Sequence, residues 1–447
     1  MENPTVKVYL SCRDTADRLS RKADLKFGPD PRGEEGRLIN IHPEIAFQTI
    51  EGFGGAFTEA AAVTLDKLPA ESRRQALEAY FDPERGLGYT LGRTHVHSCD
   101  FALGNYTYVR EDDLSLASFS LDHERAHLFP MIKDAARFAG QPIKLLASPW
   151  SPPGWMKTTG EMNRGGKLLE GCRAVWAEYL ARYCKGCAQE GIPIWALSVQ
   201  NEPKATQSWD SCIYTGEEER DFVKLFLGPT FEREGLAEVK ILVWDHNKER
   251  LLERATTVLE DPAASRYVWG VACHWYSGDH FEAIDLVRRR FPQAAVLFTE
   301  GCREKGVATG DWTTGERYAH AVIGDLNGGV CGWIDWNLVL DEHGGPNHVS
   351  NFCDAPIIGD TRTGKLTFQS SYWYLGHFSK FIRPGAVRVG FSRYSNSLEV
   401  TAARNLTGEV AVVLMNCADA ENRFILRAAG QIAPATIPAH AIMTLVF

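Results

Sequence analysis

The 447-residue sequence has no run of about 18 apolar residues, so it offers no candidate for a transmembrane helix. Its first residues are charged throughout and lack the apolar centre of an export signal. It also lacks the excess of basic residues that nucleic-acid binding requires, since the net charge is −9. We therefore expect a globular protein that binds no nucleic acid and is cytoplasmic by default. Secretion without a leader, including injection into a host cell, is compatible with this sequence.

Cysteine is present without the spacing of a disulfide framework or a zinc site. The chain has eleven cysteines, an odd number, which suits a reducing compartment. Cys184 and Cys187 form a CxxC pair, but they lie in the helical pattern WAEYLARYCKGCAQEG, which favours a structural role. We expect no cofactor and no metal.

Tryptophan is abundant. Many of the twelve Trp residues stand beside Asn, Asp, Glu or Pro rather than in apolar runs. An indole ring stacks well on the C–H face of a sugar, although several of these residues must simply fill the core. The pattern is typical of a carbohydrate-binding protein.

Short apolar segments alternate with helical patterns along most of the chain. Eight segments have strand character, at 52–57, 91–100, 143–150, 195–203, 240–247, 268–277, 295–301 and 331–337. Alternation of strand and helix predicts parallel pairing, and eight repeats predict a closed (β/α)8 TIM barrel in the α/β class. We place this catalytic barrel at residues 46–384.

The two ends of the chain have a different pattern. Residues 385–447 contain alternating segments such as EVAVVLMNC and AHAIMTLVF, and residues 1–45 contain KVYLSCRD and RLINIHPE. Two unrelated tails would leave apolar strand faces uncovered. We therefore predict a small side β-sandwich domain built from both termini.

Two glutamates end predicted barrel strands. Glu202 ends the fourth in SVQNEP, and Glu300 ends the seventh in VLFTEG. The carboxyl ends of barrel strands form the active-site face, and these two strands lie opposite each other. Hydrolysis of a glycosidic bond needs two carboxyl groups. Because two facing carboxylates cannot both ionise cheaply, one of the two pKa values should rise.

Longer motifs carry a family resemblance. They are EGFGGAFTEAA, SCDFALGNYTY, LLASPWSPPGWMKT, QNEP, ACHWYSG, GWIDWNLVLDEHGGPN and LGHFSKFIRPG. With them the chain resembles glycoside hydrolase family 30, in its glucosylceramidase-like branch. The resemblance implies a barrel with a side β-domain and a double displacement with net retention. It also implies exo action on small-molecule or glycolipid β-glucosides, including glucosylceramide-type substrates.

The resemblance assigns roles to nine residues, and His274 is a further candidate. Glu202 would be the general acid/base, and Glu300, the ionised member of the pair, would be the nucleophile. The expected sugar contacts are Asp100, Trp155, Asn201, Trp336 and Asn347. Arg93 and Tyr276 would support Glu300 and lower its pKa, and His274 would either orient its neighbours or belong to the core. Arg93 could instead pair a structural carboxylate, and Trp336 could be barrel filling.

One departure from the relatives leaves another chemistry open. The second predicted strand reads HVHSCD, with His95 and His97 where a lysosomal member of that branch carries apolar residues. With His274 and Asp335 these histidines could form the centre of a metal-dependent barrel hydrolase. A carbohydrate-binding protein that has lost catalysis is a second alternative. Within the enzyme reading, a β-1,6-glucanase, a β-xylosidase or a β-fucosidase of the same family are the alternatives.

Overall fold

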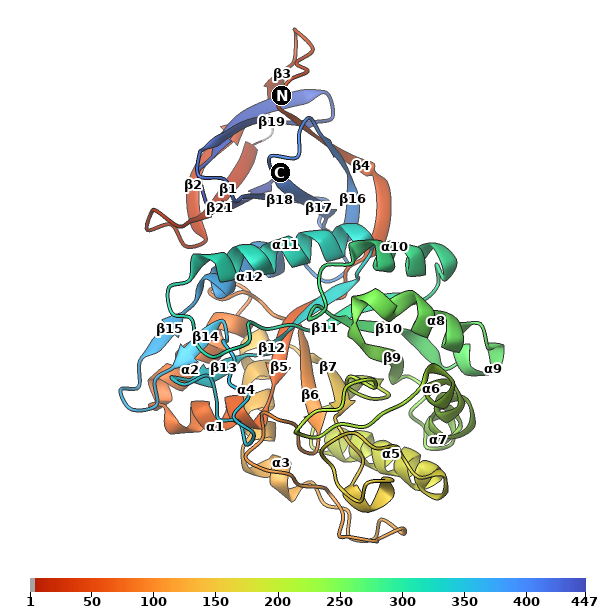
Figure 1. Cartoon of the computed structure of the whole chain (residues 1–447). Coiled ribbons are helices and arrows are strands. Elements are labelled where there is room, and N and C mark those ends of the chain that lie inside the picture. Colours follow the sequence, from red (N-terminus) through yellow and green to blue (C-terminus); the bar gives the residue numbers. More distant parts are fainter. Residues whose placement is uncertain (1–4) are drawn as a thin grey trace. The chain divides into compact units, whose positions relative to one another are not determined.

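The computed structural model describes residues 5–447 and divides them into two compact units (Figure 1). One unit contains residues 54–308 and 333–367, and the other contains the stretches up to residue 53, 309–332 and 368–447. Two helices inside the predicted barrel segment, α11 (Trp312–Gly328) and α12 (Ser370–Ser379), belong to the second unit. The sequence-based bounds at 45 and 385 stay a prediction.

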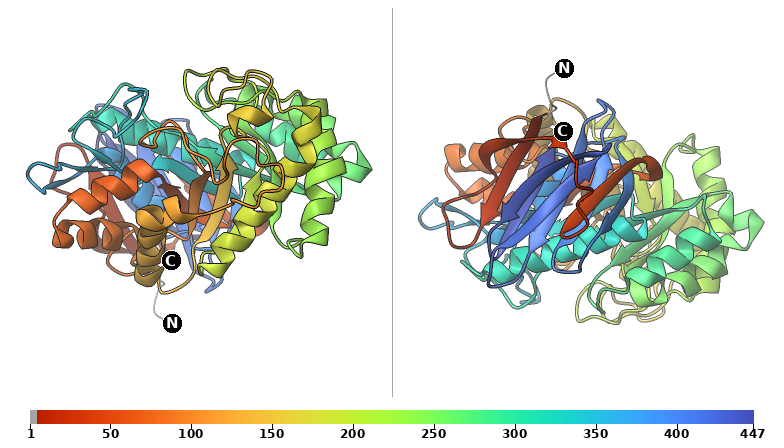
Figure 2. Two further views of the ribbon diagram at one scale, coloured as in Figure 1. Left: turned by 90° about the horizontal axis from the view of Figure 1, so that it is seen from below. Right: turned by 90° about the horizontal axis from the view of Figure 1, so that it is seen from above.

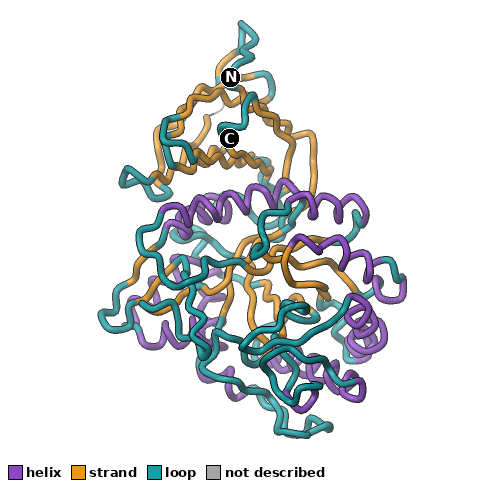
Figure 3. The backbone as a smooth tube through the Cα atoms, in the orientation of Figure 1, coloured by secondary structure: helices purple, strands orange, loops and turns teal. Residues whose placement is uncertain are grey.

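The first unit is built around a closed parallel barrel, which confirms the predicted fold class. Its eight strands follow one another around the barrel in chain order. Figure 3 draws the strands in orange and the helices in purple. They are β5 (Gly52–Phe57), β6 (Leu91–Val96), β7 (Lys144–Pro149), β8 (Ile194–Ser198), β9 (Lys240–Asn247), β10 (Val268–His274), β11 (Ala295–Glu300) and β12 (Gly332–Asn337). Every predicted strand segment overlaps one of them.

Helices and short turns connect the barrel strands. The helices are α1 (Glu59–Lys67), α2 (Ala70–Phe81), α3 (Asp122–Ala126), α4 (Leu128–Ala139), α5 (Arg173–Gln189), α6 (Gly216–Phe222), α7 (Gly228–Arg233), α8 (Leu251–Leu259), α9 (Pro262–Ser265) and α10 (Phe281–Arg290). Helical turns η1 (Gly154–Met156), η2 (Glu170–Cys172), η3 (Val223–Leu227) and η4 (Lys248–Arg250) lie between them, and short strands β13 (Val339–Asp341), β14 (Ile357–Gly359) and β15 (Leu366–Phe368) follow the barrel.

Local sequence explains these elements. In α4 the residues Leu128, Met131, Ile132 and Ala135 recur at helical spacing and are all buried, and the helix ends at Gly140 with φ 65°. The glycine motif of β5 has a steric cause. A Cβ atom on Gly54 would lie 1.9 Å from the backbone oxygen of Leu91 in β6, so only glycine allows these strands to pair this closely.

The second unit contains a ten-stranded, mostly antiparallel sheet (Figure 2). Its order is β2-β1-β21-β18-β17-β16-β4-β19-β20-β3. The strands are β1 (Thr5–Cys12), β2 (Ser20–Lys26), β3 (Gly28–Pro29), β4 (Leu38–Thr49), β16 (Val387–Arg393), β17 (Glu399–Arg404), β18 (Val410–Asn416), β19 (Asn422–Ala428), β20 (Gln431–Ile437) and β21 (Ala441–Val446). Since β1 pairs with β21, both ends of the chain build this domain, as predicted.

The sheet encloses its own core. Alternate residues of the terminal strands, such as Val8, Leu10 and Leu445, pack with Val412 and Leu414 of β18 in one buried cluster. Among residues 5–447, no helix is long and apolar enough to span a bilayer.

Candidate active site

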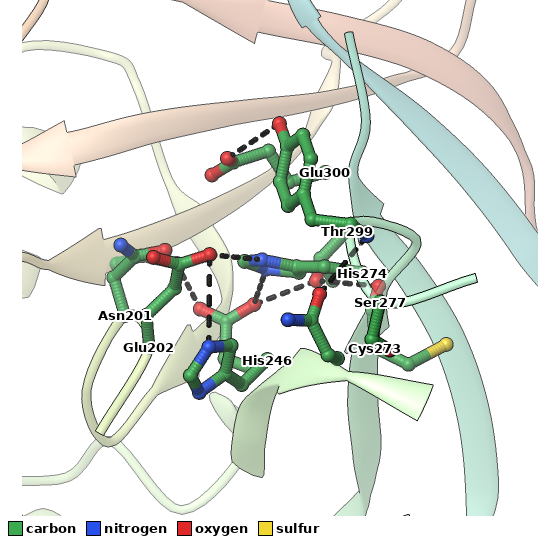
Figure 4. Close-up of polar contacts among 12 residues, drawn as sticks. Asn201, Glu202, His246, Cys273, His274, Ser277, Thr299 and Glu300 are labelled. Carbon is green, nitrogen blue, oxygen red and sulfur yellow. Dashed lines mark hydrogen bonds and ion pairs between the residues drawn. The ribbon is translucent and has the colours of Figure 1, made fainter. Parts of the chain in front are cut away.

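Side chains from the carboxyl ends of the barrel strands and from the loops after them line one pocket. Figure 4 shows the polar contacts among residues at this end of the barrel, including Glu202, His246 and Glu300. Six residues predicted from the sequence border it: Asp100, Asn201, Glu202, Tyr276, Glu300 and Trp336. The pocket wall also contains Trp150, Gln207, Trp209, His246, Asn247, Cys302, Glu304, Asn351 and Cys353. The predicted convergence of strand ends is therefore present.

Arg93 on β6 is fully buried beneath the pocket and contacts several strand ends at once. Its guanidinium donates to Glu300 Oε2, to Asn201 Oδ1 at 2.8 Å and to Asp245 Oδ2 at 2.8 Å. The charges of Asp245 and Glu300 balance the cost of burying this cation. Arg93 therefore fixes one carboxylate of the pocket and the amide oxygen of the residue beside the other.

Asp245, at the end of β9, is the counter-charge that holds His274. His274 Nε2 lies 3.0 Å from Asp245 Oδ1, and its Nδ1 lies 3.3 Å from Glu202 Oε1. Burial opposes the charge on this ring, but the carboxylates of Glu300, Asp245 and Glu202 outweigh burial and raise the pKa of His274 to about 9. At neutral pH His274 is an imidazolium that donates to both Asp245 and Glu202.

The two glutamates face each other across the pocket. An oxygen of Glu202, an oxygen of Glu300 and a ring nitrogen of His274 all lie within 4.8 Å of one another. The Tyr276 hydroxyl donates to Glu300 Oε1 at 3.0 Å, while Arg93 binds the other oxygen. The Arg93 and Tyr276 contacts to Glu300 are thus those expected from the sequence.

The direction of the pKa shifts differs from the expectation. Burial raises the pKa of Glu300, and the opposing charges of His274 and Arg93 do not offset it. Burial also acts on Glu202, but the hydrogen bond from His274 and the positive charges of its neighbours lower the pKa of Glu202. A charged His274 beside Glu202 was not expected from the sequence. The pKa of Glu300 is therefore shifted upward and that of Glu202 downward, the reverse of the order expected for a nucleophile and an acid.

Asp100 lies on the loop after β6 and is almost fully buried. Its Oδ2 accepts from Asn351 Nδ2 at 3.1 Å, and the amide of Asn347 is 3.4 Å away. Burial, followed by the charge of Glu300, raises the pKa of Asp100 to about 8. A neutral Asp100 can accept and donate hydrogen bonds, so it suits a pair of sugar hydroxyls.

Because the folded-state pKa of Asp100 is raised from 3.8 to about 8, the folded protein binds more protons than the unfolded chain between these pH values. This group therefore costs stability as the pH rises through that range. We expect Asp100→Asn to stabilise the protein by at least about 1 kcal/mol more at pH 7 than at pH 4.5, relative to the wild type. Urea unfolding at both pH values measures this. A difference that does not change with pH would contradict the raised pKa.

Aromatic rings form another wall of the pocket. Trp150 and Trp336 stack with ring centroids 5.2 Å apart, and the Arg93 guanidinium lies over both rings, 4.7 Å and 5.5 Å from their centroids. Both indoles are buried, so their position is fixed before a ligand arrives. Trp336 is therefore not simply barrel filling: part of it borders the pocket.

Two residues predicted as sugar contacts do not border the pocket. Trp155 lies on η1, and its indole nitrogen is buried without a hydrogen-bond partner. Asn347 braces its own loop, because its Oδ1 accepts from the backbone of Val349 and Asn351 at 3.0 Å. Direct contact of Trp155 and Asn347 with a sugar stays a prediction. Trp150 and Asn351, close to them in the sequence, do border the pocket.

The histidines of the HVHSCD segment are occupied by protein contacts. His95 Nε2 accepts from the backbone N–H of Glu59 at 3.0 Å, and its Nδ1 contacts the backbone oxygen of His97. The two ring nitrogens of His97 contact Tyr179 and Ser151. Neither ring offers a free nitrogen to a metal. Within residues 5–447, the cluster with metal-ligand spacing is Glu202, His274 and Glu300, which is the glutamate pair itself.

Two domain models of one family together match most of the sequence. Residues 50–382 match the TIM-barrel domain of glycosyl hydrolase family 30, and residues 385–445 match the β-sandwich domain of the same family. Putative glucosylceramidase 3 of Caenorhabditis elegans is 38% identical over 88% of this chain and 78% of its own length. Lysosomal acid glucosylceramidase of Mus musculus is 36% identical over 90% and 82%.

Solved structures with the same fold match nearly the whole chain. SrfJ from Salmonella typhimurium superposes with a TM-score of 0.96 at 38% identity and 99% coverage of both chains. The endo-β1,6-glucanase BT3312 gives a TM-score of 0.90 at 27% identity, also with 99% coverage of both. Together with the barrel and the facing glutamates, these matches establish that the chain belongs to glycoside hydrolase family 30 and is a glycoside hydrolase.

Proposed function

We propose that the protein is a retaining exo-β-glycosidase that hydrolyses β-glucosides, including glucosylceramide-type substrates. The observation that carries the mechanism is the spacing of the two glutamates. Retaining enzymes hold their carboxyl groups about 5–5.5 Å apart, whereas inverting enzymes need about 6.5–9.5 Å to admit a water. Oxygens of Glu202 and Glu300 lie within 4.8 Å, which supports the retaining mechanism.

The reaction then has two steps. Glu300 attacks the anomeric carbon while Glu202 donates a proton to the leaving oxygen, which gives a covalent glycosyl-enzyme and a free aglycone. In the second step Glu202 takes a proton from water, the water oxygen attacks the anomeric carbon, and Glu300 is released. Two inversions at one carbon give net retention.

The first step requires transfer of a proton to Glu202, although the pKa of Glu202 is lowered and that of Glu300 is raised. A bound glycoside supports the transfer, because its glycosidic oxygen can accept a hydrogen bond only from protonated Glu202. Arg93 and Tyr276 then stabilise the ionised Glu300. His274 is the positioning residue for Glu202, since Asp245 fixes its ring.

The glycone contacts follow from the pocket wall. Asn201 Oδ1 is engaged by Arg93, so its amide nitrogen is the group left to bind the 2-hydroxyl. Asp100 and Asn351 lie together and would bind further hydroxyls. The Trp150 and Trp336 rings would contact the C–H face of the sugar.

Glucosylceramide-type substrates are favoured over a glucan by the relatives. The two glucosylceramidases named above share 36–38% of their residues with this chain, whereas BT3312, an endo-β1,6-glucanase, shares 27%. The glucanase remains the second candidate because its structure covers 99% of this chain.

A substrate panel tests the proposal. Aryl β-glucoside, β-xyloside and β-fucoside would be compared with a fluorescent glucosylceramide and a β-1,6-glucan, and the anomeric form of the first product would be read by NMR. We expect the aryl β-glucoside and the glycolipid to be cleaved, with β-glucose as the first product. Release of the α-anomer would contradict retention. If the β-1,6-glucan alone were cleaved, the proposed exo-β-glucosidase activity would be wrong and an endo-glucanase activity would be favoured.

A further inference from the structure

Two cysteines lie in the wall of the active-site pocket, and the proposed reaction uses neither. They are Cys302, after β11, and Cys353, in the loop between β13 and β14. The two segments run antiparallel beside each other: Asp354 N donates to Arg303 O at 2.8 Å, and Glu304 forms a bridge with Cys353. Backbone contacts therefore hold the segment around Cys302 beside the segment around Cys353, which lies about fifty positions later in the sequence.

The two side chains meet inside the pocket. Both thiols are free, and the Cys302 thiol is hydrogen-bonded to that of Cys353. Each also contacts a residue of the site. Cys302 Sγ lies 3.5 Å from the Tyr276 hydroxyl, and Cys353 Sγ lies 3.7 Å from the backbone oxygen of Asn351.

Through these contacts the thiols are linked to Glu300 and to Asp100. The Tyr276 hydroxyl also donates to Glu300, and the Asn351 amide also donates to Asp100. A disulfide brings its sulfurs to about 2.05 Å and imposes a fixed dihedral angle. Joining the thiols would move both sulfurs, so the contact of Cys302 with Tyr276 and that of Cys353 with Asn351 would both change.

We propose that Cys302 and Cys353 form an oxidation site, at which a peroxide converts the two thiols into a disulfide and reversibly inactivates the enzyme. One sulfur attacks the peroxide, so an S–O bond forms, the O–O bond breaks and water leaves, giving a sulfenic acid. The second sulfur displaces the hydroxyl, which leaves as water with the proton of that thiol. The peroxide gains two electrons, and each sulfur loses one.

The reaction will be slow. The hydrogen bond with Cys353, and then burial, raise the pKa of the Cys302 thiol well above its ordinary value, so little thiolate is present at neutral pH. Such a pair responds to sustained oxidation rather than to a brief pulse. A ligand that fills the pocket should protect it, because both thiols line the wall.

The test is to incubate the whole protein with hydrogen peroxide, then measure aryl β-glucoside hydrolysis before and after dithiothreitol. We expect a loss of at least about tenfold that dithiothreitol restores, together with a Cys302–Cys353 disulfide in a peptide map. Cys302→Ala and Cys353→Val, each compared with its own untreated activity, should both lack the dithiothreitol-reversible loss. Cys417→Ser, which removes an exposed thiol, should keep it.

Two results would overturn the proposal. One is a reversible loss that persists in either pocket variant. The other is a mapped disulfide in an enzyme that keeps its activity. The proposal uses the proposed function only for its activity assay, while the peptide map needs no substrate. If no aryl glycoside is cleaved by untreated protein, the proposed function fails, and the map still shows whether the two thiols join.

Discussion

Glu300→Gln is expected to lower kcat/KM for an aryl β-glucoside by about 10⁴-fold or more, because an amide cannot attack the anomeric carbon. The substitution keeps the size of the side chain. Arg93 also keeps its bond to Asp245, so the loss will not come from a collapsed site. The measurement is steady-state hydrolysis with both proteins at matched concentration, after their thermal unfolding midpoints have been compared.

The matched control is Glu282→Gln. Glu282 lies on α10, and three quarters of its side chain is exposed, so the same chemical change there should leave kcat/KM within about twofold. If Glu300→Gln retained more than about a hundredth of wild-type activity with an unchanged fold, Glu300 would not be the nucleophile.

Glu202→Gln should produce a loss that depends on the leaving group. With an alkyl or lipid aglycone, where the leaving oxygen must be protonated, we expect a reduction of about 10²–10⁴-fold. With an activated aryl aglycone the first step needs little protonation, so glycosylation should be nearly normal, and the covalent intermediate should accumulate because general-base help to water is lost.

The measurement is pre-steady-state release of the aryl group together with intact mass spectrometry. A burst of one equivalent and a glycosyl adduct on the variant would support the acid/base role. The same fractional loss of activity for aryl and alkyl glucosides would contradict the acid/base role of Glu202. Because Glu202 is also a partner of His274, the thermal midpoint must be compared here as well.

Much of this site could be predicted because barrel strands fix their last residues. Glu300 is the last residue of β11, and Glu202 lies on the loop directly after β8, which ends at Ser198 rather than at the predicted position. The closed parallel barrel brings the carboxyl ends of its strands to one face, so both glutamates lie there. Asp245 could have been recognised by the same signal. It ends the apolar run KILVW, and in the structure it holds both Arg93 and His274.

The sequence could not show which loop residues border the pocket. Trp150 and Trp155 stand in the same motif, and no periodicity says which of them turns into the pocket. Asn347 and Asn351 lie on one turn, where the first braces the backbone and the second reaches Asp100. Side-chain direction in a non-repeating segment is set by hydrogen bonds that spacing alone does not encode.

The pairing of β1 with β21 sets an order of events during synthesis. β21 lies between β1 and β18, so β1, the first strand to be made, has no neighbour on that side until β21 has been made much later. Until then Val8 and Leu10 have no apolar cover from Met443 or Leu445. Such a distant pairing folds slowly. A chain that stopped before Ala441 would therefore lose an inner strand of the sheet, and a cell should treat that product as unfolded.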